Sequence, residues 1–149
     1  MRKIKFRGRS LTNGKWMCGD SIKHTMNASE NGREVLTYIG NRVPESCKVG
    51  AMKWVPVAPE TVGQFTGLLD RNGKEIYEGD VVFWIGTDMR GRGRGEQGAI
   101  FWDKHTMSWA IERDKPCADG RPCIISRPFD KRHLEVVGNI HDNPELMKQ

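Results

Sequence analysis

Residues 63–82 read GQFTGLLDRNGKEIYEGDVV, and this stretch decides the fold. Residues 63–69 and 74–77 each contain aromatic, aliphatic or β-branched side chains typical of strands. Asp70-Arg71-Asn72-Gly73 separates them as a turn, because Asn and Gly tolerate positive φ. Glu78-Gly79-Asp80 then leads into residues 81–85, whose apolar side chains occupy successive positions. Such a run predicts a strand that is covered on both faces. The stretch therefore predicts three consecutive strands of a mainly β fold.

The same signals extend outward along the chain. Asn13-Gly14 separates residues 4–9 from 15–20, which predicts a first hairpin. Residues 21–30 are polar, and we expect them to be irregular. Further strands are predicted where β-branched and aromatic residues cluster between turn signals, at residues 35–39, around Trp54 at a sheet edge, and at 99–102, 108–111 and 134–140.

Short strands with frequent turns favour a small barrel or sandwich, and we expect an SH3-like barrel in the C-terminal half. The prolines between residues 43 and 59 predict a joint, so that one domain, 1–149, divides into an N-terminal hairpin lobe, 1–58, and a barrel lobe, 59–149. Asn143 as N-cap and Pro144 at the first helical position predict a short C-terminal helix.

The composition is that of an ordinary globular protein. The 149 residues are 37% hydrophobic and 29% charged, and no apolar run approaches the length of a membrane span. We expect a cytoplasmic location. The cysteines are too sparse and irregular for a disulfide framework and should be reduced thiols: Cys18, Cys47, Cys117 and Cys123.

The positive charge is concentrated near the N-terminus. Residues 1–60 carry 11 Lys and Arg against 5 Asp and Glu, a balance of +6, whereas residues 61–149 carry 13 against 14. Five cations fall in the first nine residues, Arg7 and Arg9 among them. They either keep an edge strand from pairing with other chains or contact a partner such as nucleic acid.

Arg90-Gly91-Arg92-Gly93-Arg94-Gly95 is the second cationic segment. Guanidinium groups on a pliant backbone suit phosphates, and Trp84 and Trp102 beside them suit the stacking of single-stranded bases. The alternative interpretation is a mobile hairpin loop kept soluble by charge, with the tryptophans packed in the core.

Signals for catalysis or metal binding are weak. Glu78 and Asp80 flank Gly79 and suit a divalent metal, but hydrogen bonds to turn amides explain them as well. Folding could bring His105 and His133 near Cys117 and Cys123 to complete a zinc site. The two cysteines stand farther apart in the sequence than in a common zinc knuckle, which favours two unligated thiols. The sequence has no nucleophile elbow, phosphate loop or zinc-protease helix motif, and we expect no metal and no cofactor.

The stretch 63–82 resembles the signature of the YopX-like family of phage and prophage proteins. Ile4-Lys5-Phe6-Arg7 is similar to the family's start, Lys15-Trp16-Met17 to its second strand, and residues 134–146 to its ending. The matching positions that shape turns and strand ends are Gly67, Asn72, Gly73, Glu78, Gly79, Asp80, Gly138, Asn139, Asn143 and Pro144. Gly8-Arg9-Ser10, the Arg-Gly segment and the two late cysteines depart from the family pattern.

The resemblance implies a mainly β accessory protein of bacteriophages and prophages with no assigned reaction. We therefore expect a non-catalytic protein that binds a protein or nucleic-acid partner in the bacterial cytoplasm, with self-association into a homo-oligomer. Nucleic acid would be held by Arg7, Arg9, Arg90, Arg92 and Arg94. The alternative is a small metal-dependent hydrolase or nuclease that uses Glu78 and Asp80.

Overall fold

The computed structural model describes residues 3–29, 32–42, 52–87, 92–114, 124–125 and 133–148. The chain divides into two compact units, Met1–Phe65 and Thr66–Gln149, and each is treated by itself. The predicted boundary after residue 58 lies inside the first unit, and the division of one family domain into lobes stays a prediction. No helix among the described residues has the length and apolar character to cross a membrane.

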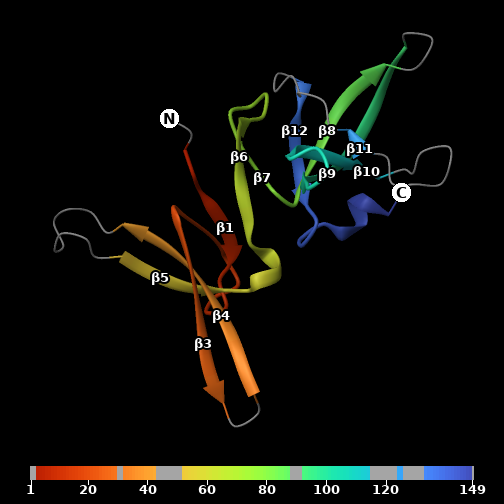
Figure 1. Cartoon of the computed structure of the whole chain (residues 1–149). Helices are drawn as coiled ribbons and strands as arrows, with labels where there is room; N and C mark the ends of the chain where they lie inside the picture. Colours follow the sequence, from red (N-terminus) through yellow and green to blue (C-terminus); the bar gives the residue numbers. More distant parts are fainter. Residues whose placement is uncertain are drawn as a thin grey trace. The chain divides into compact units, whose positions relative to one another are not determined.

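The first unit begins with the predicted hairpin (Figure 1). Strands β1 (Phe6–Arg9) and β2 (Trp16–Gly19) pair antiparallel, and Gly14 in their turn has a φ of 68°. On its other side β1 pairs with the start of β6 (Gly63–Leu69), where Phe6 lies opposite Gln64. Strand β1 is therefore internal, and the interpretation of its cations as guards of a sheet edge is wrong.

Three more strands form the second sheet of this unit, in the order β3 (Ser21–Ser29), β4 (Gly32–Arg42) and β5 (Met52–Val57). The expectation of an irregular segment at 21–30 is wrong, because β3 pairs with β4 along its whole length. Cross-strand pairing stabilises polar residues that would not form a strand alone. The prediction of an edge strand around Trp54 is confirmed by β5.

Glycines let the strands of the first unit approach closely. A Cβ on Gly8 would lie 3.0 Å from Ile39 Cδ1, and one on Gly19 would collide with the Gly40 carbonyl oxygen. Ile39 and Val57 are buried at this contact. A short 3-10 turn, η1 (Pro59–Thr61), then leads into β6.

The second unit contains residues 66–82 of the motif that spans residues 63–82. The later part of β6 neighbours β7 (Glu75–Tyr77), and both predicted strands are confirmed. Five strands then form one sheet in the order β11-β10-β9-β8-β12: β8 (Asp80–Thr87), β9 (Gly93–Asp103), β10 (Ser108–Arg113), β11 (Ile124–Ile125) and β12 (Glu135–Asn139). These confirm the strands predicted at 99–102, 108–111 and 134–140.

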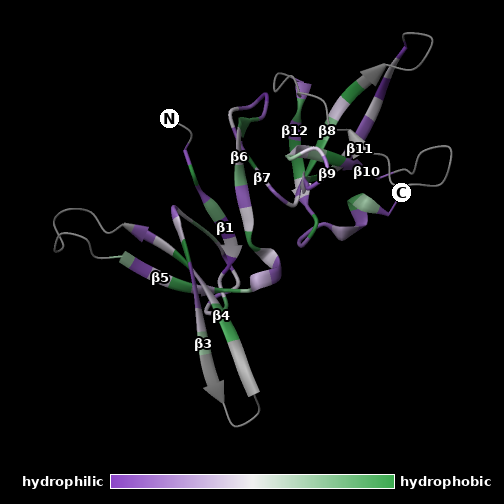
Figure 2. Cartoon of the chain, viewed as in Figure 1, coloured by the Kyte–Doolittle hydropathy of each residue, from purple (hydrophilic) through white to green (hydrophobic). Residues whose placement is uncertain are grey.

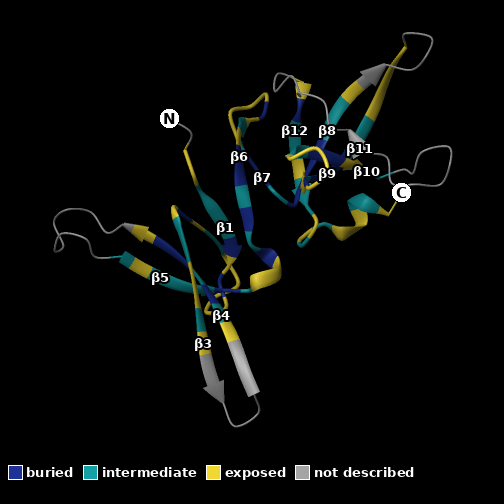
Figure 3. Ribbon diagram, in the orientation of Figure 1, coloured by how far each residue is buried: buried dark blue, intermediate teal, exposed yellow. Residues whose placement is uncertain are grey.

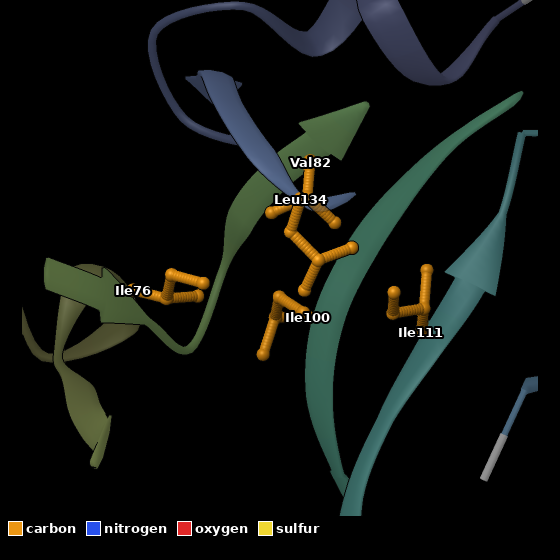
Figure 4. Packing of buried hydrophobic residues seen from close by; sticks show 5 residues of the cluster. All are labelled: Ile76, Val82, Ile100, Ile111 and Leu134. Atoms are coloured by element: carbon orange, nitrogen blue, oxygen red, sulfur yellow. The ribbon is translucent and has the colours of Figure 1, made fainter. Parts of the chain in front are cut away.

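An aliphatic cluster forms the core of the second unit. It consists of Ile76, Val82, Ile100, Ile111 and Leu134, with Trp84 and Trp109 packed against it (Figure 4). Val81 and Val82 are both fully buried, so β8 is covered on both faces there, as predicted, although Ile85 is 66% exposed. Figures 2 and 3 show how hydrophobic and buried positions coincide along the strands. The unit is mainly β, and the SH3-like barrel stays a prediction.

The expected C-terminal α-helix is not present. Residues Pro144–Met147 form a single 3-10 turn, η3, and the Asn143 side chain caps no backbone amide. The bond from Leu146 N–H to the Asn143 carbonyl spans three residues, as in a 3-10 turn. The Leu146 carbonyl accepts instead from Gln97 Nε2 at 2.6 Å, so a contact with β9 replaces continuation of a helix.

Candidate nucleic-acid interface

Two predicted arginines, Arg7 and Arg9, project from the same face of β1, because side chains alternate along a strand. The opposite face carries Gly8 and Ser10, which are buried. Arg9 is exposed and Arg7 is half-buried. The strand therefore separates a face that carries Phe6, Gly8 and Ser10 from a face that carries the two arginines.

Aromatic side chains accompany these cations. The Arg7 guanidinium carbon lies 4.9 Å from the centre of the Trp16 ring, and the Lys5 ammonium lies 5.9 Å from that of Phe65. Arg9 Nε donates to the Gly14 carbonyl at 3.0 Å, which ties the side chain to the hairpin turn. We call Lys5, Arg7, Arg9 and Trp16 the basic face.

An open hollow of about 490 Å³ adjoins the basic face. Its walls are formed by the start of the chain, the end of β2 and the end of β4, through Lys3, Ile4, Lys5, Cys18, Gly19, Asp20 and Asn41. Sequence reasoning missed Asp20 and Asn41. No sequence pattern connects them, since they meet only where Gly19 approaches Gly40.

The Arg-Gly segment is more ordered than predicted. Arg92 directly precedes β9, and Arg94 lies within β9 opposite Gly86; both arginines are exposed. The expectation of a glycine-rich loop is wrong from Gly93 onward, because the strand runs through Gly95, where a Cβ would lie 2.9 Å from the Phe83 ring. Arg90 lies outside the described residues.

The tryptophans near this segment differ in their surroundings. Trp84 and Trp109 pack against the core cluster, which confirms the packing interpretation for both. Trp102 is 37% exposed and meets Trp109 edge to face at 5.1 Å. Of these three tryptophans, only Trp102 is exposed, and it lies in β9, the strand that also contains Arg94. The Arg-Gly segment therefore has a weaker aromatic surface than predicted.

One of the two carboxylates that flank Gly79 in the central motif, Asp80, bonds to the backbone. Asp80 is buried and its Oδ2 accepts from the Tyr77 amide at 2.8 Å. Glu78 is half-buried and precedes Gly79, whose φ is 81°. Within the described ranges no three His, Cys, Asp or Glu side chains gather as a metal site would require. His105 and His133 are described, whereas Cys117 and Cys123 are not.

Asp70 accepts hydrogen bonds from several backbone amides. It is buried and accepts from the amides of Asn72 and Lys74, both at 2.8 Å, and of Val136 at 3.1 Å. Burial alone would raise the pKa of Asp70, but these three amides and the Lys74 charge together lower the pKa below its ordinary value. The turn of the motif is thereby fastened to β12.

The remaining motif residues also shape turns. Gly67, Gly73 and Gly79 have φ values of 89°, 81° and 81°, which favour glycine. A Cβ on Gly138 would lie 2.6 Å from Asn143 Oδ1, and Asn139 Oδ1 accepts from the amides of His141 and Asp142. Pro144 opens the 3-10 turn. In these positions the side chains and glycines support strand ends.

The comparison with protein-family models agrees with the resemblance seen in the sequence. The family model described as YopX protein matches residues 5–148. A crystal structure of protein EF1440 from Enterococcus faecalis is similar at 21% identity and a TM-score of 0.43, covering 97% of this chain and 98% of that one. No curated protein matches. The chain belongs to the YopX protein family.

Proposed function

We propose that the chain is a phage-type accessory protein of the bacterial cytoplasm that acts without catalysis, by binding nucleic acid through the basic face. The observation that carries this proposal is the position of β1. The strand is paired on both sides, so its cations have no edge to protect. Arg7 and Arg9 share one face of the strand, which concentrates positive charge there and suits a polyanion.

The charge of the two units supports the same assignment. The unit ending at Phe65 contains all 11 cations and 5 acids of the N-terminal part, a balance of +6, and the other unit has a balance of −1. Nucleic acids are attracted by clustered cations and release counterions on binding. We assign a secondary contact to Arg92 and Arg94, with Arg90, because both described members are exposed.

The alternatives have less support. A hydrolase or nuclease built on Glu78 and Asp80 would need both carboxylates at a metal, but Asp80 is buried against the Tyr77 amide. A protein partner in place of nucleic acid has less support, because clustered cations suit a polyanion best.

The proposal also includes self-association into a homo-oligomer and an SH3-like barrel in the second unit.

Fluorescence anisotropy with labelled single-stranded and duplex DNA and RNA, at about 50 and 200 mM salt, tests the function. We expect binding that weakens steeply with salt. Replacement of Arg7 and Arg9 by Gln should lower the slope of log K against log salt by about 1.4 on single strands, since each lost phosphate contact removes about 0.7. The same replacement of Arg92 and Arg94 should lower it less.

The matched control replaces Lys104 and Lys148 by Gln. Both are exposed in the second unit, and the change in net charge is the same. The control should bind as the wild type does. Absence of binding at low salt, or an equal loss in the control, would contradict the proposal, provided that thermal unfolding shows every variant to be folded.

A further inference from the structure

The hollow beside the basic face is formed by a close approach of two strands. A Cβ on Gly19 would lie 2.5 Å from Ile39 Cγ2, and the Asp20 amide donates to the Gly40 carbonyl at 3.2 Å. These contacts place Asp20 next to Asn41 at the end of β4. The volume of about 490 Å³ lies within the range of about 300–1,000 Å³ that is usual for small-molecule sites.

Two of the polar side chains that line the hollow, Asn41 and Asp20, offer hydrogen-bond acceptors. Asn41 Nδ2 donates to the Cys18 carbonyl at 2.5 Å, which fixes the amide and leaves its oxygen as the acceptor end. Ser21 Oγ donates to Asp20 Oδ1 at 2.9 Å, and a carboxylate accepts at several further positions. A ligand that suits this pair must therefore offer hydrogen-bond donors.

The other walls suit a nucleotide. Lys3 and Lys5 supply positive charge at the rim, and Ile4, 56% exposed, supplies an apolar surface. Lys5 also belongs to the basic face, so the hollow and that face are continuous. Side chains two apart on a strand are separated by about 6.7 Å, which lets successive cations follow an extended backbone.

We propose that the hollow receives one unstacked base of a single-stranded nucleic acid that lies along the basic face. The inference rests on the proposed function and adds the class of ligand. The acceptors of Asp20 and Asn41 favour a base with an exocyclic amine, such as cytosine or adenine, over thymine and uracil, which present a carbonyl at the equivalent position. A duplex would first have to release a base from its stack.

Anisotropy with labelled oligo-dC and oligo-dT of equal length, about 12 nucleotides, tests this inference on the whole chain. Both are pyrimidine strands of the same size class, and they differ at the exocyclic 4-substituent, at N3 and in the C5 methyl group of thymine. We expect oligo-dC to bind about tenfold more tightly than oligo-dT, and both to bind more tightly than the oligo-dC·oligo-dG duplex.

Asp20→Asn should abolish most of the preference for dC, because it replaces a carboxylate acceptor with an amide that also donates. Binding of oligo-dT should strengthen slightly, because a negative charge is lost. Glu60→Gln makes the same charge change at an exposed position of the first unit and does not line the hollow, so it should keep the tenfold preference. A preference that survives in Asp20→Asn overturns the role of Asp20.

The two proposals fail in different ways. Equal, salt-dependent binding of oligo-dC and oligo-dT, or tighter binding of the duplex, overturns the base site and leaves nucleic-acid binding intact. Absence of binding to every strand and duplex at about 50 mM salt overturns the proposed function and the base site with it.

Discussion

The two units of the chain bury apolar side chains to different extents. Among the described residues, the first unit buries three hydrophobic side chains, Ile39, Val57 and Phe65, whereas the second buries nine, including the core cluster around Ile100. Glycines permit close strand approach in both units, but a cluster of large aliphatic residues is found in the second. Burial of such residues contributes about 1.5–3 kcal/mol each, so the second unit has the larger hydrophobic stabilisation.

The charged side chains of the two units also have different roles. The family motif lies mainly in the second unit, and its carboxylates Asp70 and Asp80 accept hydrogen bonds from backbone amides. The cations of the first unit project outward from β1. Sequence motifs that identify the family thus support the fold of one unit, while the surface chemistry that suits a ligand is concentrated in the other.

The largest effect is expected at Asp70. Asp70→Asn puts an NH2 donor in place of the oxygen that accepts from the Val136 amide, and it removes the negative charge that strengthens the bonds from the Asn72 and Lys74 amides. It should lower the free energy of unfolding by about 3 kcal/mol. Chemical denaturation monitored by tryptophan fluorescence measures the change. Glu112→Gln, an exposed carboxylate in the same unit, should stay within about 0.5 kcal/mol of the wild type.

The same carboxylate predicts a pH dependence. The pKa of folded Asp70 is lowered, so its contribution is fully present above the unfolded value of about 3.9 and is lost as the pH falls through the folded value. The wild type should therefore lose more stability below about pH 4 than Asp70→Asn does. Parallel acid profiles of the two proteins would contradict this account.

An intermediate effect is expected at two glycines, one in each unit. A Cβ on Gly19 would lie 2.5 Å from Ile39 Cγ2, and one on Gly98 would lie 2.5 Å from Ile111 Cγ2. Each Gly→Ala substitution should cost about 2 kcal/mol by overpacking. Amide hydrogen exchange should report the loss of protection mainly in the unit that carries the substitution.

Gly93→Ala is the control for these two substitutions. Its Cβ would lie 3.3 Å from Ile85 Cγ2, an exposed side chain that can move. We expect little loss of protection. If Gly19→Ala lowered protection equally in β1 and in β9, the two units would unfold together and the contrast between them would not hold for stability.

The local signals of the sequence predicted the strands well. Asn13-Gly14, the 70–73 turn and the apolar run at 81–85 each specify structure over a few residues, and the corresponding elements formed. Strand β3 and the C-terminal turn were predicted wrongly, because both depend on distant partners. Residues 21–29 need β4 as a neighbour, and Leu146 is held by Gln97.

The candidate site was predictable only in part. Charge counting singled out Arg7 and Arg9, but whether β1 lay at an edge depended on its pairing with β6, nearly 60 residues away in the sequence. The hollow was beyond prediction, since Asp20 and Asn41 meet through the packing of Gly19 against Gly40. Contacts between glycines leave no periodic pattern in a sequence.

The smallest effect is expected at the ion pair between Arg71 and Glu135, which joins the same turn and strand as Asp70 does. The side chains are 48% and 32% exposed, so solvent and salt screen their attraction. Arg71→Gln should lower the free energy of unfolding by less than about 1 kcal/mol, and a double-mutant cycle with Glu135→Gln should give a coupling that disappears in about 1 M salt. A coupling as large as the effect of Asp70→Asn would mean that surface charge, rather than buried contacts, fastens the turn to β12, and the contrast between a packed second unit and a charged first unit would lose its basis.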